Sequence, residues 1–101
     1  MHVFKAILVT IGRKSGNEHS VEIRTVFHDG KFYFSRRNSE SDWLKNAMHN
    51  PNVKIIHQEK TITGTAYLVN DKELCKKISK MKYNDTRSEE ARIVLEVTPN
   101  E

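Results

Sequence analysis

Residues 21–36 read VEIRTVFHDGKFYFSR, and this stretch decides the fold class. Alternate residues from Val21 to Phe27 share one face, which predicts a strand that is buried on that face only. Asp29-Gly30 is a strong hairpin-turn signal, and Lys31 to Arg36 reads as the returning strand. The stretch therefore predicts an antiparallel β-hairpin.

The chain upstream predicts one more strand and a glycine turn. Val3 to Ile11 is rich in β-forming residues and has apolar residues on both faces, as expected of a strand in a closed barrel. Residues 12–17, GRKSGN, follow with turn chemistry, and their two glycines allow a positive φ. The first part of the chain is therefore predicted as three consecutive strands.

The chain downstream begins with a predicted helix. The polar spacing from Ser39 to Asp42 is typical of a helix start, and Asn50-Pro51 ends the helix because the residue before proline avoids the α region. One helical face is expected to carry Trp43, Leu44, Ala47 and Met48. A strand pair follows, Val53 to Gln58 and Thr61 to Val69, around Glu59-Lys60. Gly64 indicates a bulge or a close backbone approach in the second of these strands.

The last segment predicts a helix and a strand. Asn70 with Glu73 is expected to cap the helix, and Arg92 to Val97 to form the strand. The apolar face of the helix carries Leu74, Cys75, Ile78 and Met81, and the strand turns Ile93, Leu95 and Val97 inward. The order βββαββαβ predicts a mainly β (α+β) single domain over residues 1–101, a six-stranded antiparallel barrel with two helices filling its gaps.

Composition restricts the function classes. The single cysteine, Cys75, rules out a disulfide framework and a multi-cysteine zinc site, and its place on the apolar helix face indicates a core residue. The longest apolar run is too short for a transmembrane helix, and the N-terminus lacks a signal-peptide pattern, so we expect a soluble, cytoplasmic protein. The surplus of Lys and Arg, 17 against 13 acidic residues, favours an anionic partner. Nucleic acid, a phosphorylated cofactor and an acidic protein would all satisfy it.

Searches for familiar catalytic motifs give nothing. The sequence contains no phosphate loop, dinucleotide fingerprint, nucleophile elbow or HExxH motif. Its five histidines show no pairing at helical spacing, so no bound metal and no catalytic side chain is predicted.

Polar and aromatic residues around the first three strands and the first helix form the candidate site. They are Thr10, Arg13, Lys14 and Ser15 at the end of the first hairpin, Ser35, Arg36 and Arg37 at the end of the third strand, and Trp43 and Asn46 on the helix. Cationic groups converging from separate strands would bind a phosphate, with an aromatic wall beside them for a planar ring. The alternative from spacing alone is that these are solvated turn residues and that Trp43 anchors the core.

Several short motifs, in this order, resemble a known family. Residues 10–16 read TIGRKSG after a strand, Asp29-Gly30 follows, and residues 43–51 read WLKNAMHNP. The order is similar to that of the split β-barrel flavin-binding superfamily that includes pyridoxamine phosphate oxidase. Within it, the chain most resembles the deazaflavin-dependent nitroreductase family, with its T-x-G-R-x-S-G turn and W-x-x-N-L-x-x-N-P helix. The resemblance runs from about Leu8 to about Val69.

The resemblance implies a cofactor site and a reaction class. The cofactor, FMN or a deazaflavin coenzyme, would carry the hydride chemistry, and the substrate would be a small planar electron acceptor such as a quinone or a nitro compound. A homodimer with the cofactor near the subunit interface is also implied. The residues implied for cofactor binding are Arg13, Lys14, Ser15, Val21, Ile23, Ser35, Arg36, Trp43 and Asn46.

Three positions depart from the family pattern. His19 stands where the family usually has arginine, Glu22 where it has proline, and Ala47 where it has leucine. A non-catalytic binding module on the same barrel, without the cofactor, is therefore the main alternative function. A nucleic-acid binder is disfavoured because the aromatic residues Phe27, Phe32, Phe34 and Tyr67 are expected in strand interiors rather than on a stacking platform.

Overall fold

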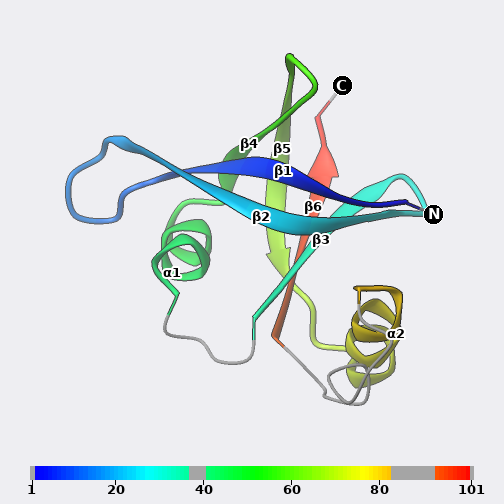
Figure 1. Ribbon diagram of the computed structural model, residues 1–101. Coiled ribbons are helices and arrows are strands. Elements are labelled where there is room, and N and C mark those ends of the chain that lie inside the picture. The colour runs from blue at the N-terminus through cyan, green and yellow to red at the C-terminus, as the bar shows by residue number, and fades with distance from the viewer. Residues whose placement is uncertain (1, 37–40, 83–92, 101) are drawn as a thin grey trace.

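The computed structural model describes residues 2–36, 41–82 and 93–100. Its elements follow the predicted order βββαββαβ (Figure 1). They are β1 (His2–Ile11), β2 (Glu18–His28), β3 (Lys31–Arg36), α1 (Asp42–His49), β4 (Asn52–His57), β5 (Lys60–Leu68), α2 (Lys72–Lys82) and β6 (Ile93–Pro99). The prediction of a mainly β fold with two helices is confirmed.

The six strands close into an antiparallel barrel in the order β1-β2-β3-β6-β5-β4. β1 and β2 pair along their whole length, from His2 opposite Phe27 to Ile11 opposite Glu18. β2 and β3 pair only next to their turn, over residues 26–28 and 31–33. The far end of the β1–β2 hairpin therefore extends away from the barrel, and α1 lies next to it (Figure 1).

The interior of the barrel is filled from the strands and from α1. Phe34, Leu44 and Ile55 are among the residues that are completely or almost completely buried there. Trp43, Leu44 and Ala47 place one face of α1 in this core cluster, as predicted, whereas Met48 is 56% exposed. The helix ends where it was predicted to end, because Asn50 donates its N–H to the Asn46 carbonyl and Pro51 follows.

A second core cluster lies under α2, on the outer face of the barrel. It contains Val26, Tyr33, Cys75, Ile78 and Val94. The prediction of one buried face for β2 is therefore wrong at Val26, and Val94 of β6 is likewise buried on its outward side. Both residues are fully covered because α2 packs against this part of the sheet. Cys75 is a core residue as predicted, and burial raises the pKa of its thiol.

The outer face of β6 also carries a partly buried polar group next to this cluster. The Tyr33 hydroxyl donates to Glu96 Oε2 at 3.2 Å, and Lys31 Nζ lies 3.2 Å from Glu96 Oε1. Burial, followed by the neighbouring Glu96 carboxylate, raises the pKa of Tyr33 to about 12. The lysine thus balances the charge of a carboxylate that also anchors the Tyr33 ring.

Several local predictions are shifted by the structure. Asp71 rather than Asn70 caps α2, because Asp71 Oδ1 accepts hydrogen bonds from the backbone N–H groups of Glu73 and Leu74 at 2.9 and 3.3 Å. The β4–β5 turn lies at Gln58-Glu59, both at positive φ, one residue before the predicted position. The side chain of Met81, predicted for the apolar face of α2, is outside the described part of the chain.

Two further predictions for β5 have opposite outcomes. The predicted close approach at Gly64 is confirmed, because a Cβ atom there would lie 2.5 Å from Val97 Cγ1 and 3.0 Å from the Thr98 carbonyl oxygen. The burial predicted for Tyr67 is wrong, since its side chain is 58% exposed. The exposed Tyr67 ring is therefore no longer an argument against a stacking surface for nucleic acid. Phe32 and Phe34 are buried, so the argument holds for them.

Candidate cofactor-binding site

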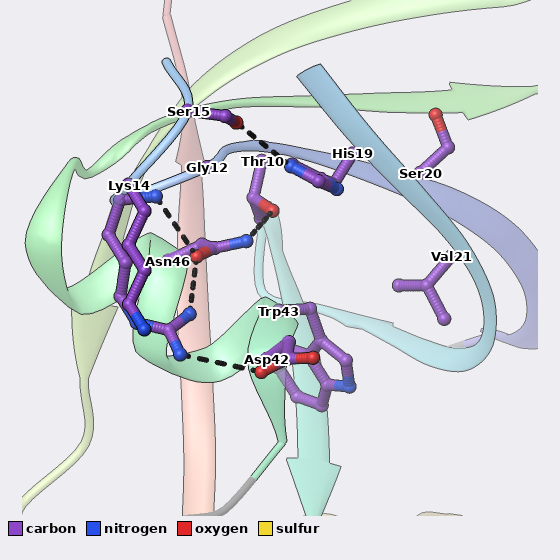
Figure 2. Close-up of a pocket in the computed structure, with 11 residues that line it drawn as sticks. Thr10, Gly12, Lys14, Ser15, His19, Ser20, Val21, Asp42, Trp43 and Asn46 are labelled. Carbon is purple, nitrogen blue, oxygen red and sulfur yellow. Dashed lines mark hydrogen bonds and ion pairs between the residues drawn. The ribbon is translucent and has the colours of Figure 1, made fainter. Parts of the chain in front are cut away.

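An open hollow of about 450 Å³ lies between the tip of the β1–β2 hairpin and α1 (Figure 2). Its size falls in the range of small-molecule sites. Its lining consists of Thr10, Gly12, Arg13, Lys14, Ser15, His19, Ser20, Val21, Asp42, Trp43 and Asn46. In Figure 2, Lys14 lies at one end and Val21 at the other, with Thr10, His19 and Asn46 between them.

The two glycines of the hairpin have different structural roles. Gly16 has φ +73°, a conformation that favours glycine, and donates its N–H to the Gly12 carbonyl at 2.9 Å. A Cβ atom at Gly12 would lie 2.6 Å from both His19 Nε2 and Ser15 Oγ, so a side chain there would displace the ends of these two side chains. Only glycine at position 12 lets the His19 ring and the Ser15 hydroxyl lie against the turn.

Asn46 of α1 fastens the hairpin to the helix. Its Oδ1 accepts hydrogen bonds from Arg13 Nη1 at 2.7 Å and from the Arg13 backbone N–H at 3.3 Å. Its Nδ2 donates to Thr10 Oγ1 at 3.3 Å, and both Asn46 and Thr10 are buried. The amide thus fixes the position of Arg13 relative to the barrel, which makes Asn46 a positioning residue as well as part of the lining.

Arg13 and Lys14 are adjacent cations of the turn, and they differ in their hydrogen-bond and ion-pair partners. Besides its bonds to Asn46, Arg13 places Nη2 3.4 Å from Asp42 Oδ1. The exposed Lys14 ammonium has no hydrogen-bond or ion-pair partner among the described residues. Arg13 is therefore a fixed positive charge in the lining of the hollow, and Lys14 is available to meet an anion.

Trp43 both packs in the core and lines the hollow, which are the two roles that the sequence left open for it. It is 8% exposed and packs against Phe34, with ring centroids 6.3 Å apart at an interplanar angle of 61°. It also lines the hollow. Trp43 is thus a core anchor whose remaining surface, with Val21 across the hollow, offers an apolar wall to a ligand (Figure 2).

Ser15 and His19 form a polar pair at the rim of the hollow. Ser15 Oγ lies 3.3 Å from His19 Nε2, within hydrogen-bond distance, and accepts the backbone N–H of Asn17 at 3.1 Å. Both side chains are exposed to solvent and to the hollow. They add donors that suit an oxygen-rich anion.

The hollow unites most, but not all, of the residues predicted for cofactor binding. It brings together Arg13, Lys14, Ser15, Val21, Trp43 and Asn46. Ile23 is half-buried against the barrel core and Ser35 is 3% exposed, and neither lines the hollow. The side chain of Arg36 and the whole of Arg37 lie outside the described residues. Contacts of Ile23, Ser35 and Arg36 with a cofactor remain predictions.

Some lining residues had not been assigned to the predicted site. These are Gly12, His19, Ser20 and Asp42, whereas Thr10 belonged to the candidate site predicted from the sequence and does line the hollow. His19 had a usable signal, since it stands opposite Thr10 in the register of a hairpin whose turn was already recognised. No such signal exists for Asp42, because its position in the lining depends on how α1 packs against the hairpin.

The donor set suits a ligand with an anionic tail and a planar ring. Arg13 and Lys14 supply positive charge at one end, Ser15 and His19 supply polar hydrogens, and Val21 with Trp43 supplies the apolar wall. Among the described lining residues Asp42 is the one acidic side chain, and Arg13 balances its charge. The residues present therefore fit a phosphate-bearing aromatic cofactor.

A second hollow, of about 540 Å³, lies at the opposite end of β1. It is lined by Val3, Phe4, Phe27, Phe32, His57, Gln58, Lys60 and Ile62. The rings of Phe4 and His57 are 4.3 Å apart there, and those of Phe27 and Phe32 are 4.8 Å apart. This aromatic hollow has one lysine in its lining and lacks the paired cations of the hairpin site.

Within the described ranges, no cluster of His, Cys, Asp or Glu side chains is arranged to hold a metal ion. In the same ranges, every helix is too short or too polar to cross a bilayer.

Comparison with solved structures identifies the fold. An F420H2-dependent reductase superposes with a TM-score of 0.71 at 22% sequence identity, covering 96% of this chain and 98% of that one. A Listeria innocua protein assigned to the pyridoxamine 5′-phosphate oxidases gives 0.72 at 18% identity, with 96% and 84% covered. A structure described as a domain-swapped dimer gives 0.73 at 22% identity, with 92% and 78% covered. The fold is the split β-barrel of pyridoxamine 5′-phosphate oxidase-like proteins.

The sequence identifies the family within this class. Residues 2–93 match the family described as F420H2-dependent quinone reductase, and the chain belongs to that family. It is accordingly a deazaflavin-dependent redox protein. No curated protein matches the chain in sequence.

Proposed function

We propose that the hairpin hollow holds the deazaflavin cofactor F420 and that the protein uses it to reduce a small quinone. The observation that carries this proposal is the presence, in one hollow, of two adjacent cations and an apolar wall formed by Trp43 and Val21. Membership of the F420H2-dependent quinone reductase family supports the choice of F420 over FMN and of a quinone as acceptor.

The chain's own residues would bind and orient the cofactor. Lys14 would contact the phosphate of the tail directly, and Arg13, held by Asn46 and Asp42, would provide fixed positive charge beneath it. Trp43 and Val21 would bound the more apolar part of the ligand and restrict its orientation. When bound, the deazaflavin supplies the hydride chemistry, and the protein supplies position and charge.

The proposal also covers the access of the quinone acceptor, the oligomeric state and the cellular location. The hollow is open, so an acceptor has direct access to a cofactor held in it. A homodimer and a cytoplasmic location are part of the same proposal. The homodimer is supported by the similarity to a structure described as a domain-swapped dimer.

A titration with two cofactors tests the proposed function. Purified protein is mixed with oxidised F420 or with FMN, passed through gel filtration, and monitored by visible absorption. We expect F420 to coelute with the protein and to bind more tightly than FMN, because the family match points to a deazaflavin. The bound, reduced cofactor should then be reoxidised by a soluble quinone.

The other outcomes are equally definite. Protein that retains neither compound would favour the binding module that has lost its cofactor. Retention of FMN alone would reverse the choice of cofactor, and binding of F420 without reoxidation by quinones would remove the proposed acceptor. The elution volume, compared with the monomer mass of 11.8 kDa, reports on the homodimer in the same experiment.

A further inference from the structure

The pair formed by His19 and Ser15 gives the hairpin hollow a donor set that depends on protonation. Ser15 Oγ already accepts the Asn17 backbone N–H at 3.1 Å, and His19 Nε2 lies 3.3 Å away from the same oxygen. The His19 ring also lies so close to Gly12 that a Cβ atom there would be 2.6 Å from Nε2. The ring is therefore positioned to form one hydrogen bond with the Ser15 hydroxyl.

The direction of that hydrogen bond depends on the tautomer while the imidazole is neutral, and it is fixed once the imidazole is protonated. A neutral ring with a bare Nε2 accepts the Ser15 hydroxyl hydrogen, which then points away from any ligand. A protonated ring must donate from Nε2 to Ser15 Oγ, because both of its nitrogens carry hydrogen. The hydroxyl hydrogen is then free to point into the hollow. Protonation thus adds one positive charge and excludes the arrangement in which the ring accepts the Ser15 hydroxyl hydrogen.

Among the residues that the structure describes, the charged groups around His19 leave this change uncompensated. From the turn, Lys14 lines the hollow without a described partner, and Arg13 is engaged by α1. On β2, the neighbouring Glu18 is bound by Lys54 of β4 at 2.7 Å, and Asp42 of α1 is balanced by Arg13. The two nearby carboxylates are therefore paired elsewhere, and an anion in the hollow is the natural partner for a protonated His19.

We propose that His19, through Ser15, makes the binding of the anionic cofactor dependent on pH. Binding becomes tighter as the pH falls, because a protonated His19 ring places one more positive charge beside the anion. By linkage, the bound anion favours the protonated ring to the same extent that protonation favours the anion, so binding takes up a proton. This inference rests on the proposed function, because it deepens the assignment of the same hollow.

The test measures the Kd of oxidised F420 at pH 5.5 and at pH 8 and at constant ionic strength. We expect the wild type to bind about fivefold more tightly at pH 5.5, the effect of one solvent-exposed charged contact. His19→Gln should bind with nearly the same Kd at both values, and His19→Arg should bind tightly at both. The matched control is His49→Gln, a histidine at the exposed end of α1 and outside the lining, which should keep the wild-type ratio.

Protonation of the ligand itself affects every variant equally. A difference in pH dependence between the wild type and His19→Gln therefore comes from the protein. Calorimetry in two buffers of different ionisation enthalpy gives a second measurement on the unmodified protein. Proton uptake on F420 binding near neutral pH should be present in the wild type and lost in His19→Gln. An equal pH ratio in the wild type and His19→Gln would overturn the inference while leaving the proposed function intact. Failure of the wild type to bind F420 at either pH would instead overturn the proposed function.

Discussion

Replacement of Lys14 by alanine is expected to weaken F420 binding by about tenfold and to change the free energy of unfolding by less than about 0.5 kcal/mol. The reason is that the Lys14 ammonium lines the hollow without a described partner, so its charge serves the ligand rather than the fold. The measurement is a Kd by titration alongside urea denaturation of the cofactor-free protein.

A matched control separates this local contact from the overall charge. Lys77 is exposed on α2, away from the hollow, and Lys77→Ala removes the same charge. It should leave the Kd within about twofold, which is the remainder expected from screened long-range attraction. Equal weakening by Lys14→Ala and Lys77→Ala would show that the net charge, and not the hollow, binds the cofactor.

Replacement of Asn46 by alanine is expected to reduce the free energy of unfolding by about 2 to 3 kcal/mol and to weaken F420 binding as well. The substitution removes the acceptor for Arg13 Nη1 and for the Arg13 backbone N–H, and it leaves the buried Thr10 hydroxyl without its Asn46 donor. Both effects arise from one amide because the hairpin and α1 share it. Urea denaturation and the F420 titration measure them separately.

Two further variants test whether these losses of stability and of F420 binding come from the hydrogen bonds of Asn46. Asn46→Asp keeps an oxygen for Arg13, loses the Nδ2 donor to Thr10 and adds a negative charge to the lining, so stability should recover in part while F420 binding stays weak. Asn70→Ala removes an exposed asparagine that does not cap α2, and we expect it to be neutral in both assays. If Asn46→Ala were as stable as the wild type, the role of Asn46 in fastening the hairpin to the helix would be wrong.

Local patterns in the sequence were sufficient to predict the order of the elements. The Asp29-Gly30 turn and the alternation on either side of it predict β2 and β3, and Asn50-Pro51 predicts the end of α1. The errors arise where distant segments pack together. Val26 is buried on the outward face because α2, far along the chain, covers it. Tyr67 is exposed because it shares the outward face of β5 with Thr65.

The candidate site could be predicted only as far as it is local in sequence. Arg13, Lys14 and Ser15 belong to one turn, so the motif that identifies one of them identifies all three. The contact of Arg13 with Asn46 joins residues 33 positions apart and depends on how α1 fits beside the hairpin. Ile23 shares the inward face of β2 with Val21, as the alternation predicts, but it lies farther along β2 from the hairpin tip and packs against the barrel core. How far the hollow reaches along β2 depends on where α1 packs and not on the motif.

The central claim is that the deazaflavin lies in the hairpin hollow. Backbone amide chemical shifts of ¹⁵N-labelled protein, followed during an F420 titration, test it most directly because they locate the ligand without any substitution. We expect the largest changes at residues 12–15, at His19 and at Val21, with little change around the aromatic hollow near Phe4 and Gln58. Saturable changes centred on Phe4 and Gln58, with the hairpin unaffected, would contradict the account.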